Sequence, residues 1–200
     1  MKRLFLLLNI ILAVNLSDAQ ETYRFRTDAP QGFSVENSTE TNLSLHYAIT
    51  ELGITDIYND EAKGQEIVLK GSFGSFAEGL PNLPFENRYI AVPRDATVSI
   101  KVKENGSQTL NDIDLLPAAA VQGNTAVGMP KTQKDMSVFG KDACFPAKNV
   151  TIAQTTQIRG LNVVMLSVTP FLLQSRQKDL RSHLRHGYRN QLRRRQRAVW

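Results

Sequence analysis

Apolar and polar residues alternate with a period of two over several short stretches of this chain. Between residues 41 and 50, every second residue from Leu43 to Ile49 is apolar, which predicts a half-buried β-strand. No segment between residues 20 and 171 shows sustained helical periodicity. Short strands separated by turn residues predict an all-β fold, an antiparallel β-sandwich or open barrel. The predicted strands cover residues 41–50, 54–58, 65–70, 89–92, 98–102, 108–116, 136–139, 150–156 and 161–169.

The stretch from Gly79 to Val102 has the most distinctive pattern. It begins with Pro81 and Pro84, each of which fixes φ and lacks a backbone donor. Two apolar runs follow, separated by Pro93 and turn-prone residues, which predicts strand, turn and strand with one buried face. The proline-rich beginning is expected to cross a sheet edge or to cap a sheet end, because proline does not fit inside a sheet.

Residues 117–135 differ in composition from the rest of the chain. They are mostly small and polar and have no periodic apolar face. We therefore predict a long exposed loop here. Loops of this length within a compact domain are usually functional or disordered.

Residues 1–19 resemble a secretory signal peptide. Lys2 and Arg3 precede a mostly apolar run of 13 residues, and small residues at Ser17 and Ala19 favour cleavage between Ala19 and Gln20. The alternative, a transmembrane anchor, is disfavoured because a helix needs about 20 apolar residues to span a bilayer. We expect an exported protein, periplasmic or secreted to the cell surface, with no membrane span in the mature chain.

The net charge of +5 comes from the C-terminal residues. Residues 172–200 hold eight arginines and one lysine against one acid, whereas residues 1–171 hold 15 basic and 18 acidic residues. One interpretation is a basic arm for nucleic acid or another anionic surface. The preferred one is a frameshift product or disordered tail, because the neighbouring reading frame can encode a turn and an alternating strand. We therefore predict a signal peptide at 1–19, a β-domain at 20–171 and a tail at 172–200, without nucleic-acid binding.

Cys144 is the only cysteine, so an intrachain disulfide is excluded. As a nucleophile it would need a nearby histidine. His46 lies on the polar side of a predicted strand, and His183 and His186 lie in the tail. We expect Cys144 to pack as a small buried hydrophobe. The sequence predicts no catalytic dyad and no enzyme activity of the chain itself.

Metal and cofactor sites are not predicted either. The chain has no Cys/His cluster with ligand spacing and no acidic calcium loop. Asp112 and Asp114 flank Ile113, and we interpret them as a solvated polar face of a strand.

The proline-bounded stretch resembles the N-terminal propeptide of gingipain-type, Arg/Lys-specific cysteine peptidases. The similarity covers roughly residues 40–171, with weaker matches at Gly71 and Phe73, at residues 138–141, at Phe145-Pro146 and at residues 158–160. The resemblance implies a β-domain that assists folding of a cognate peptidase domain and holds it latent. It also implies that a basic side chain from an exposed loop enters the specificity pocket. The residues that carry the resemblance are Gly79, Pro81, Leu83, Pro84, Arg88, Ile90, Ala91, Val92, Pro93 and Ala96.

The inhibitory loop implied by the resemblance is residues 117–135. Its basic residue would fall near Gly128, and the nearest candidates in this chain are Lys131 and Lys134. Each of these lysines has the alternative of being a solvated loop charge. Arg88 has two interpretations, an ion pair within the domain or a pair with an acid of the peptidase.

The preferred hypothesis is a propeptide-like domain of a gingipain-type peptidase precursor, here separated from its catalytic domain. The alternative is a secreted or surface β-sandwich that acts as an adhesion or binding module.

Overall fold

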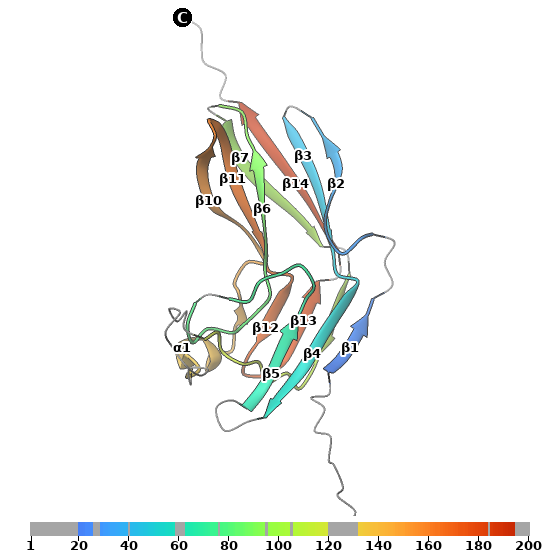
Figure 1. The fold of residues 1–200 in the computed structure, drawn as a ribbon, viewed down its shortest axis with the longest axis vertical. Helices are drawn as coiled ribbons and strands as arrows, with labels where there is room; N and C mark the ends of the chain where they lie inside the picture. Colours follow the sequence, from blue (N-terminus) through green and yellow to red (C-terminus); the bar gives the residue numbers. More distant parts are fainter. Residues whose placement is uncertain are drawn as a thin grey trace, which may run out of the picture.

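The computed structural model describes residues 20–25, 29–39, 41–58, 63–75, 77–94, 96–104, 106–119, 132–183 and 185–194. These ranges hold fourteen β-strands and one four-residue helix, which confirms the predicted all-β class. The strands form two β-sandwiches stacked along the long axis of the molecule, an upper and a lower one in the view of Figure 1. Within the described ranges, no helix has the length and hydropathy needed to cross a bilayer.

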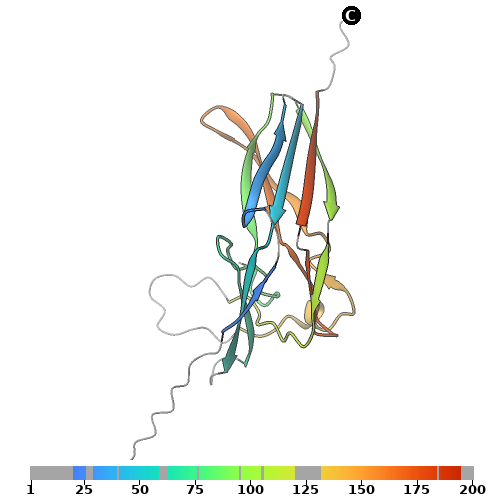
Figure 2. The ribbon, with the colours of Figure 1, turned by 90° about the vertical axis from the view of Figure 1, so that its right-hand side faces the viewer.

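The upper sandwich packs a four-stranded sheet against a three-stranded one, and both are antiparallel. Figure 2 shows the four-stranded sheet in front, with β14 between β3 and β7. The four-stranded sheet has the order β2 (Gly32–Ser38), β3 (Asn42–Ala48), β14 (Arg185–Arg194) and β7 (Ala96–Glu104). The three-stranded sheet has the order β10 (Val150–Ile158), β11 (Leu161–Val168) and β6 (Glu86–Ala91).

The lower sandwich is built in the same way, again from antiparallel sheets. Its three-stranded sheet has the order β1 (Gln20–Arg24), β4 (Glu51–Tyr58) and β5 (Lys63–Val68). Its four-stranded sheet has the order β8 (Ser107–Leu110), β13 (Asp179–His183), β12 (Phe171–Gln174) and β9 (Cys144–Phe145).

The chain passes between the two sandwiches by short connections, and the buried residues of both form one core. β3 continues into β4 and β11 into β12 across two residues each. Tyr47 and Leu166 of the upper sandwich and Leu52 and Phe171 of the lower one belong to the same cluster of buried residues. The alternation predicted for residues 43–49 is confirmed, because Leu45, Tyr47 and Ile49 are buried.

The predicted domain boundary at residue 171 does not hold in the structure. Residues 171–174, 179–183 and 185–194 form β12, β13 and β14, which pair with strands from the rest of the chain. Leu173 and Leu180 are fully buried in the shared core. The prediction of a disordered tail is therefore wrong for residues 172–183 and 185–194, because their strands complete sheets in both sandwiches. The frameshift origin of these residues stays a prediction. Residues 195–200 lie outside the described ranges.

Two further strand predictions are corrected. Residues 136–139 form the helix α1 (Met136–Phe139), because Asp135 caps its first turn. Of the predicted strand 108–116, only β8 is regular, while Gln65 and Leu115 form an isolated parallel bridge. The two apolar runs of residues 89–102 are strands as predicted, but β6 and β7 belong to different sheets.

Candidate functional site

The two ends of the predicted loop 117–135 are bound to the same dipeptide. Ala118 donates its backbone N–H to the Leu80 carbonyl (2.7 Å) and accepts from the Gly79 N–H (3.0 Å). At the other end, the Asp135 N–H donates to the Gly79 carbonyl (2.9 Å). Residues 79 and 80 therefore act as a backbone clamp for the loop. We call Gly79, Leu80, Ala118 and Asp135 the loop clamp.

Two features favour glycine at residue 79. Its φ is +78°, in the left-handed region that residues other than glycine rarely adopt. A Cβ there would also lie 3.2 Å from the carbonyl oxygen of Gln133 and 3.5 Å from the Cβ of Asp135. The local chain thus approaches the loop stem so closely that any other residue would require the stem to shift by a few tenths of an ångström.

The prolines of the same motif continue this contact. Pro81 forms an antiparallel bridge with Pro117, and the Asn82 N–H donates to the Leu116 carbonyl (3.0 Å). Leu83 and Pro84 are buried beside this bridge. The proline-bounded stretch therefore lies against the residues that enter the loop, rather than within a regular sheet.

The short helix α1 follows the loop directly. The Asp135 carboxylate accepts a hydrogen bond from the Ser137 N–H (2.8 Å), the standard arrangement of an N-cap. Hydrogen bonding from Ser137 lowers the pKa of Asp135. The cap fixes the chain direction just where the loop ends.

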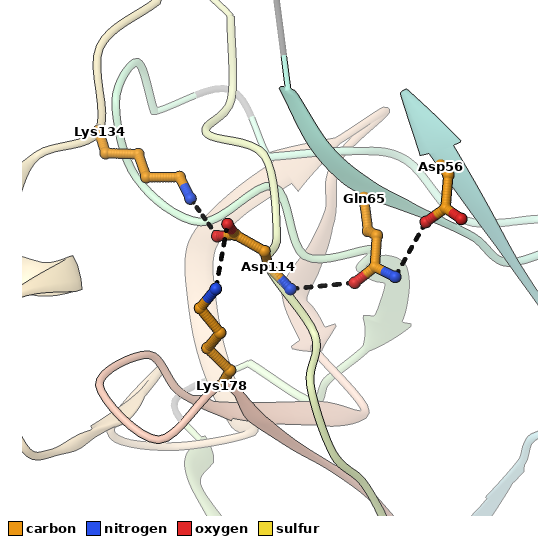
Figure 3. Close-up of polar contacts among 5 residues, drawn as sticks. All are labelled: Asp56, Gln65, Asp114, Lys134 and Lys178. Atoms are coloured by element: carbon orange, nitrogen blue, oxygen red, sulfur yellow. Dashed lines mark hydrogen bonds and ion pairs between the residues drawn. The ribbon is translucent and has the colours of Figure 1, made fainter. Parts of the chain in front are cut away.

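Asp114 joins the loop stem to the lower sandwich (Figure 3). Its carboxylate accepts from the ammonium group of Lys134 through Oδ1 and pairs with Lys178 through Oδ2 (3.4 Å). Its backbone N–H donates to Oε1 of Gln65 (2.9 Å), whose Nε2 donates to Asp56 (3.0 Å). We call Asp114, Lys134 and Lys178 the carboxylate junction.

The electrostatics of the junction favour an ionised Asp114. Partial burial raises the pKa of this carboxyl, but the hydrogen bonds and charges of Lys134 and Lys178 outweigh burial and hold the pKa below its usual value. Lys134 is the less exposed of the two lysines, with 29% of its side chain accessible against 52% for Lys178. Its ammonium group also lies 5.1 Å from the ring centroid of Phe139.

Of the two lysines predicted as inhibitory candidates, Lys134 lies within the described ranges. Lys134 lies at the base of the loop and is already paired. Lys131, like residues 120–130, lies outside the described ranges. Of the predicted signal-cleavage pair, Ala19 also lies outside them, and Gln20 is the first residue of β1.

Arg88 makes contacts within the domain. It forms an ion pair with Glu86 (3.0 Å), and its guanidinium lies 5.4 Å from the ring centroid of Phe33. Burial raises the pKa of Glu86, although Arg88 opposes the shift. A groove of about 530 Å³ opens here between β2 and β6, lined partly by the exposed Val35 and Tyr89.

Cys144 does not occupy the buried position that the sequence predicted. It is exposed, because β9 is a two-residue edge strand of the lower sandwich. His46 is half-buried on β3, and the side chains of His183 and His186 are not described. Among the described residues, no group of three or more His, Cys, Asp or Glu could hold a metal ion.

The sequence did not identify the carboxylate junction. Asp112 and Asp114 were predicted to share a solvated strand face, but Asp112 has a φ of +61° and Asp114 is paired with two lysines. The partners Lys134 and Lys178 come from distant segments, so no local spacing indicates the contact. The glycine and prolines beside the loop, in contrast, were recognisable as an unusual motif.

Comparisons with known proteins agree with this architecture. The sequence profile of a family described as Propeptide_C25 matches residues 13–185. No curated protein gives a significant match. A chain from a structure on the zymogenic latency of gingipain K from Porphyromonas gingivalis superposes with a TM-score of 0.74 at 15% identity, covering 88% of this chain and 100% of that one. A chain from a complex of Porphyromonas gingivalis RgpB pro- and mature domains gives 0.69 at 16% identity, covering 80% and 85%.

Proposed function

The chain belongs to the Propeptide_C25 family, and from this premise we propose that its β-domain binds a cognate Arg/Lys-specific cysteine peptidase and holds it latent. In this proposal, a lysine from the loop enters the specificity pocket of the peptidase. We assign that role to Lys131 and not to Lys134. The domain also assists folding of the peptidase, as the family resemblance implies.

The pairing of Lys134 is the observation that carries this assignment. Its ammonium group already donates to Asp114 and contacts the Phe139 ring. Its neighbour Asp135 is held by the loop clamp and caps α1. Insertion of Lys134 into a pocket would break these contacts, so it serves better as part of the scaffold.

The sequence separation of Lys131 from the loop clamp favours it for the other role. It lies four residues before the clamped Asp135, and four residues reach at most about 14 Å when extended. We therefore expect a residue at this separation to reach beyond the clamp while the clamp still restrains its position. A rigid scaffold lowers the entropy cost of presenting such a residue.

The binding chemistry is that of a charged group in a specificity pocket. A pocket for Arg or Lys contains a carboxylate, and a charge-assisted hydrogen bond to it is stronger than a neutral one. The domain contributes the cation and the backbone around it, and the catalytic groups belong to the peptidase. Export through the predicted signal at residues 1–19 fits such a precursor, with cleavage after Ala19.

The test is inhibition of purified gingipain-type cysteine peptidases, one Arg-specific and one Lys-specific, by the mature chain of residues 20–200. We expect the wild-type chain to inhibit at least one of them. Lys131→Gln should weaken inhibition by at least about 30-fold, the effect of removing one partner of a buried charge pair. Lys134→Gln is the matched control and should change it by less than about fivefold.

Two results would contradict the proposal. Absence of inhibition by the wild-type chain at micromolar concentration would remove the latency function. A larger loss for Lys134→Gln than for Lys131→Gln, at equal thermal stability, would exchange the roles of the two lysines.

A further inference from the structure

We propose that Asp114 is a positioning residue for the loop 117–135, and that its contacts with Lys134 and Lys178 set how tightly the domain binds its peptidase. The inference rests on the proposed function and names a residue that strengthens binding to the peptidase. Asp114 does not touch the peptidase in this proposal. It acts through Lys134, the last side chain before the loop clamp.

The backbone of Asp114 is fixed from both sides. Its carbonyl accepts from the Gln65 N–H (2.8 Å), and its own N–H donates to the Gln65 side chain (2.9 Å). The neighbouring Ile113 N–H donates to the Lys178 carbonyl (2.8 Å). A Cβ at Gly64 would lie only 2.6 Å from the Asp114 carbonyl oxygen, so β5 lies directly against this segment.

Packing holds the same segment in place. The flanking residues Ile113 and Leu115 are 5% and 1% exposed and belong to the shared core. The side chain of Asp114, in contrast, remains 46% accessible. A polar group is therefore presented at the surface from a backbone that has little freedom to move.

The carboxylate of Asp114 contacts two segments that are far apart in the sequence. Lys134 comes from the stem of the loop, and Lys178 from the turn between β12 and β13. Asp135, next to Lys134, is bound by the loop clamp. Lys134 is thus held through its side chain, and the next residue, Asp135, is held independently through its backbone.

Two constraints on adjacent residues fix a direction as well as a position. The backbone bond of Asp135 alone would allow the preceding chain to rotate about it. The contacts of Lys134 with Asp114 and with the Phe139 ring remove much of that freedom. A loop that leaves the base in a defined direction has less entropy to lose on binding, and its affinity is higher for that reason.

The size of the effect follows from the exposure of the groups. Partly exposed ion pairs contribute about 0.2–1 kcal/mol. Loss of the junction should therefore weaken inhibition by at most about fivefold. This is much smaller than the loss expected for the inserted lysine itself.

The experiment compares Asp114→Asn with Asp112→Asn in the mature chain, residues 20–200. Asp112 is an exposed carboxylate of the same segment with a φ of +61°, which asparagine tolerates. The double variant of Asp114→Asn with Lys134→Gln tests whether the two residues act through one contact. Asp114→Glu tests rescue of the charge.

Two readouts are needed. The first is the inhibition constant against the peptidase that the wild-type chain inhibits. The second uses no gingipain-type peptidase: the rate at which elastase, which cuts after small residues, cleaves the isolated chain between residues 119 and 132. Melting temperatures are recorded for every variant.

We expect Asp114→Asn to weaken inhibition and to speed elastase cleavage, with little change in melting temperature. Asp112→Asn should behave as wild type, Asp114→Glu should recover part of the affinity, and the double variant should lose less than the sum of the two single losses. Equal values for wild type and Asp114→Asn in both readouts would overturn the inference, as would additive losses in the double variant. If the wild-type chain fails to inhibit, the proposed function fails, and the elastase readout still decides the role of Asp114.

Discussion

Gly79 offers the sharpest test of the loop clamp, through the substitution Gly79→Ala. The residue has a φ of +78°, and an alanine Cβ would approach the Gln133 carbonyl oxygen to 3.2 Å. Placing an L-residue in the left-handed region costs roughly 1–2 kcal/mol. The close contact adds an overpacking cost of about 1–3 kcal/mol. We therefore expect Gly79→Ala to lower the free energy of unfolding by about 2–5 kcal/mol.

Gly160→Ala separates the two contributions. Gly160 has a nearly identical φ of +81°, in the turn between β10 and β11, and no atom lies within 4 Å of its would-be Cβ. It should therefore show the backbone cost alone, roughly 1–2 kcal/mol. The difference between the two variants measures how closely residue 79 approaches the loop stem.

Both variants are measured by urea unfolding and by thermal melting of the mature chain. Each kcal/mol should lower the melting temperature of a chain of this size by about 2–4 °C. Gly79→Ala should also speed elastase cleavage between residues 119 and 132, whereas Gly160→Ala should not. Equal destabilisation by the two substitutions would refute the argument, because it would show that residue 79 needs only its backbone conformation and not the missing side chain.

Two further predictions concern the tail and the junction. Leu180→Ala in β13 should destabilise the chain by about 2–5 kcal/mol, because Leu180 is fully buried. The control Leu161→Ala, at a residue that is 62% exposed, should change stability by less than about 0.5 kcal/mol. A negligible effect of Leu180→Ala in urea unfolding would place residues 172–194 outside the folded core. Because the pKa of Asp114 is lowered in the folded chain, its stabilising contribution is present above the ordinary value of 3.8 and is lost as the pH falls through the lowered pKa. The difference in unfolding free energy between wild type and Asp114→Asn should thus be under about 1 kcal/mol at pH 6 and should shrink as the pH is lowered below 3.8. A difference that does not shrink with falling pH would show that the ionised carboxylate is not its source.

The sequence predicted those strands whose pattern reflects their own burial. In β3, Leu45 and Tyr47 are buried on one face, as the alternation requires. α1 was predicted as a strand because four residues are too few to show a helical period. The sequence did carry a capping pattern, although not a periodicity. Asp135 immediately precedes the four helical residues, of which Ser137 is the second.

β14 was not predictable by the same reasoning. Its residues include a glycine and an asparagine, which are depleted in strands, and the segment lacks an alternating apolar pattern. It is a strand because β3 and β7 both pair with it, so tertiary pairing overrides local preference. The candidate site divides in the same way: the motif at Gly79 was visible, but its contact with Asp135 and the pairing of Asp114 with Lys178 depend on the fold.

The central place of β14 has a consequence for the order in which the molecule can assemble. A ribosome delivers β3 and β7 long before residues 185–194, and until those residues arrive the two strands have no common neighbour in the sheet. The upper four-stranded sheet is thus completed by the last described segment, inserted between partners made much earlier. Such long-range closure is slow, and an incomplete sheet exposes edges that invite wrong pairing. We expect the upper sandwich to stay open in the nascent chain until β14 has been synthesised, a state compatible with threading through an export channel.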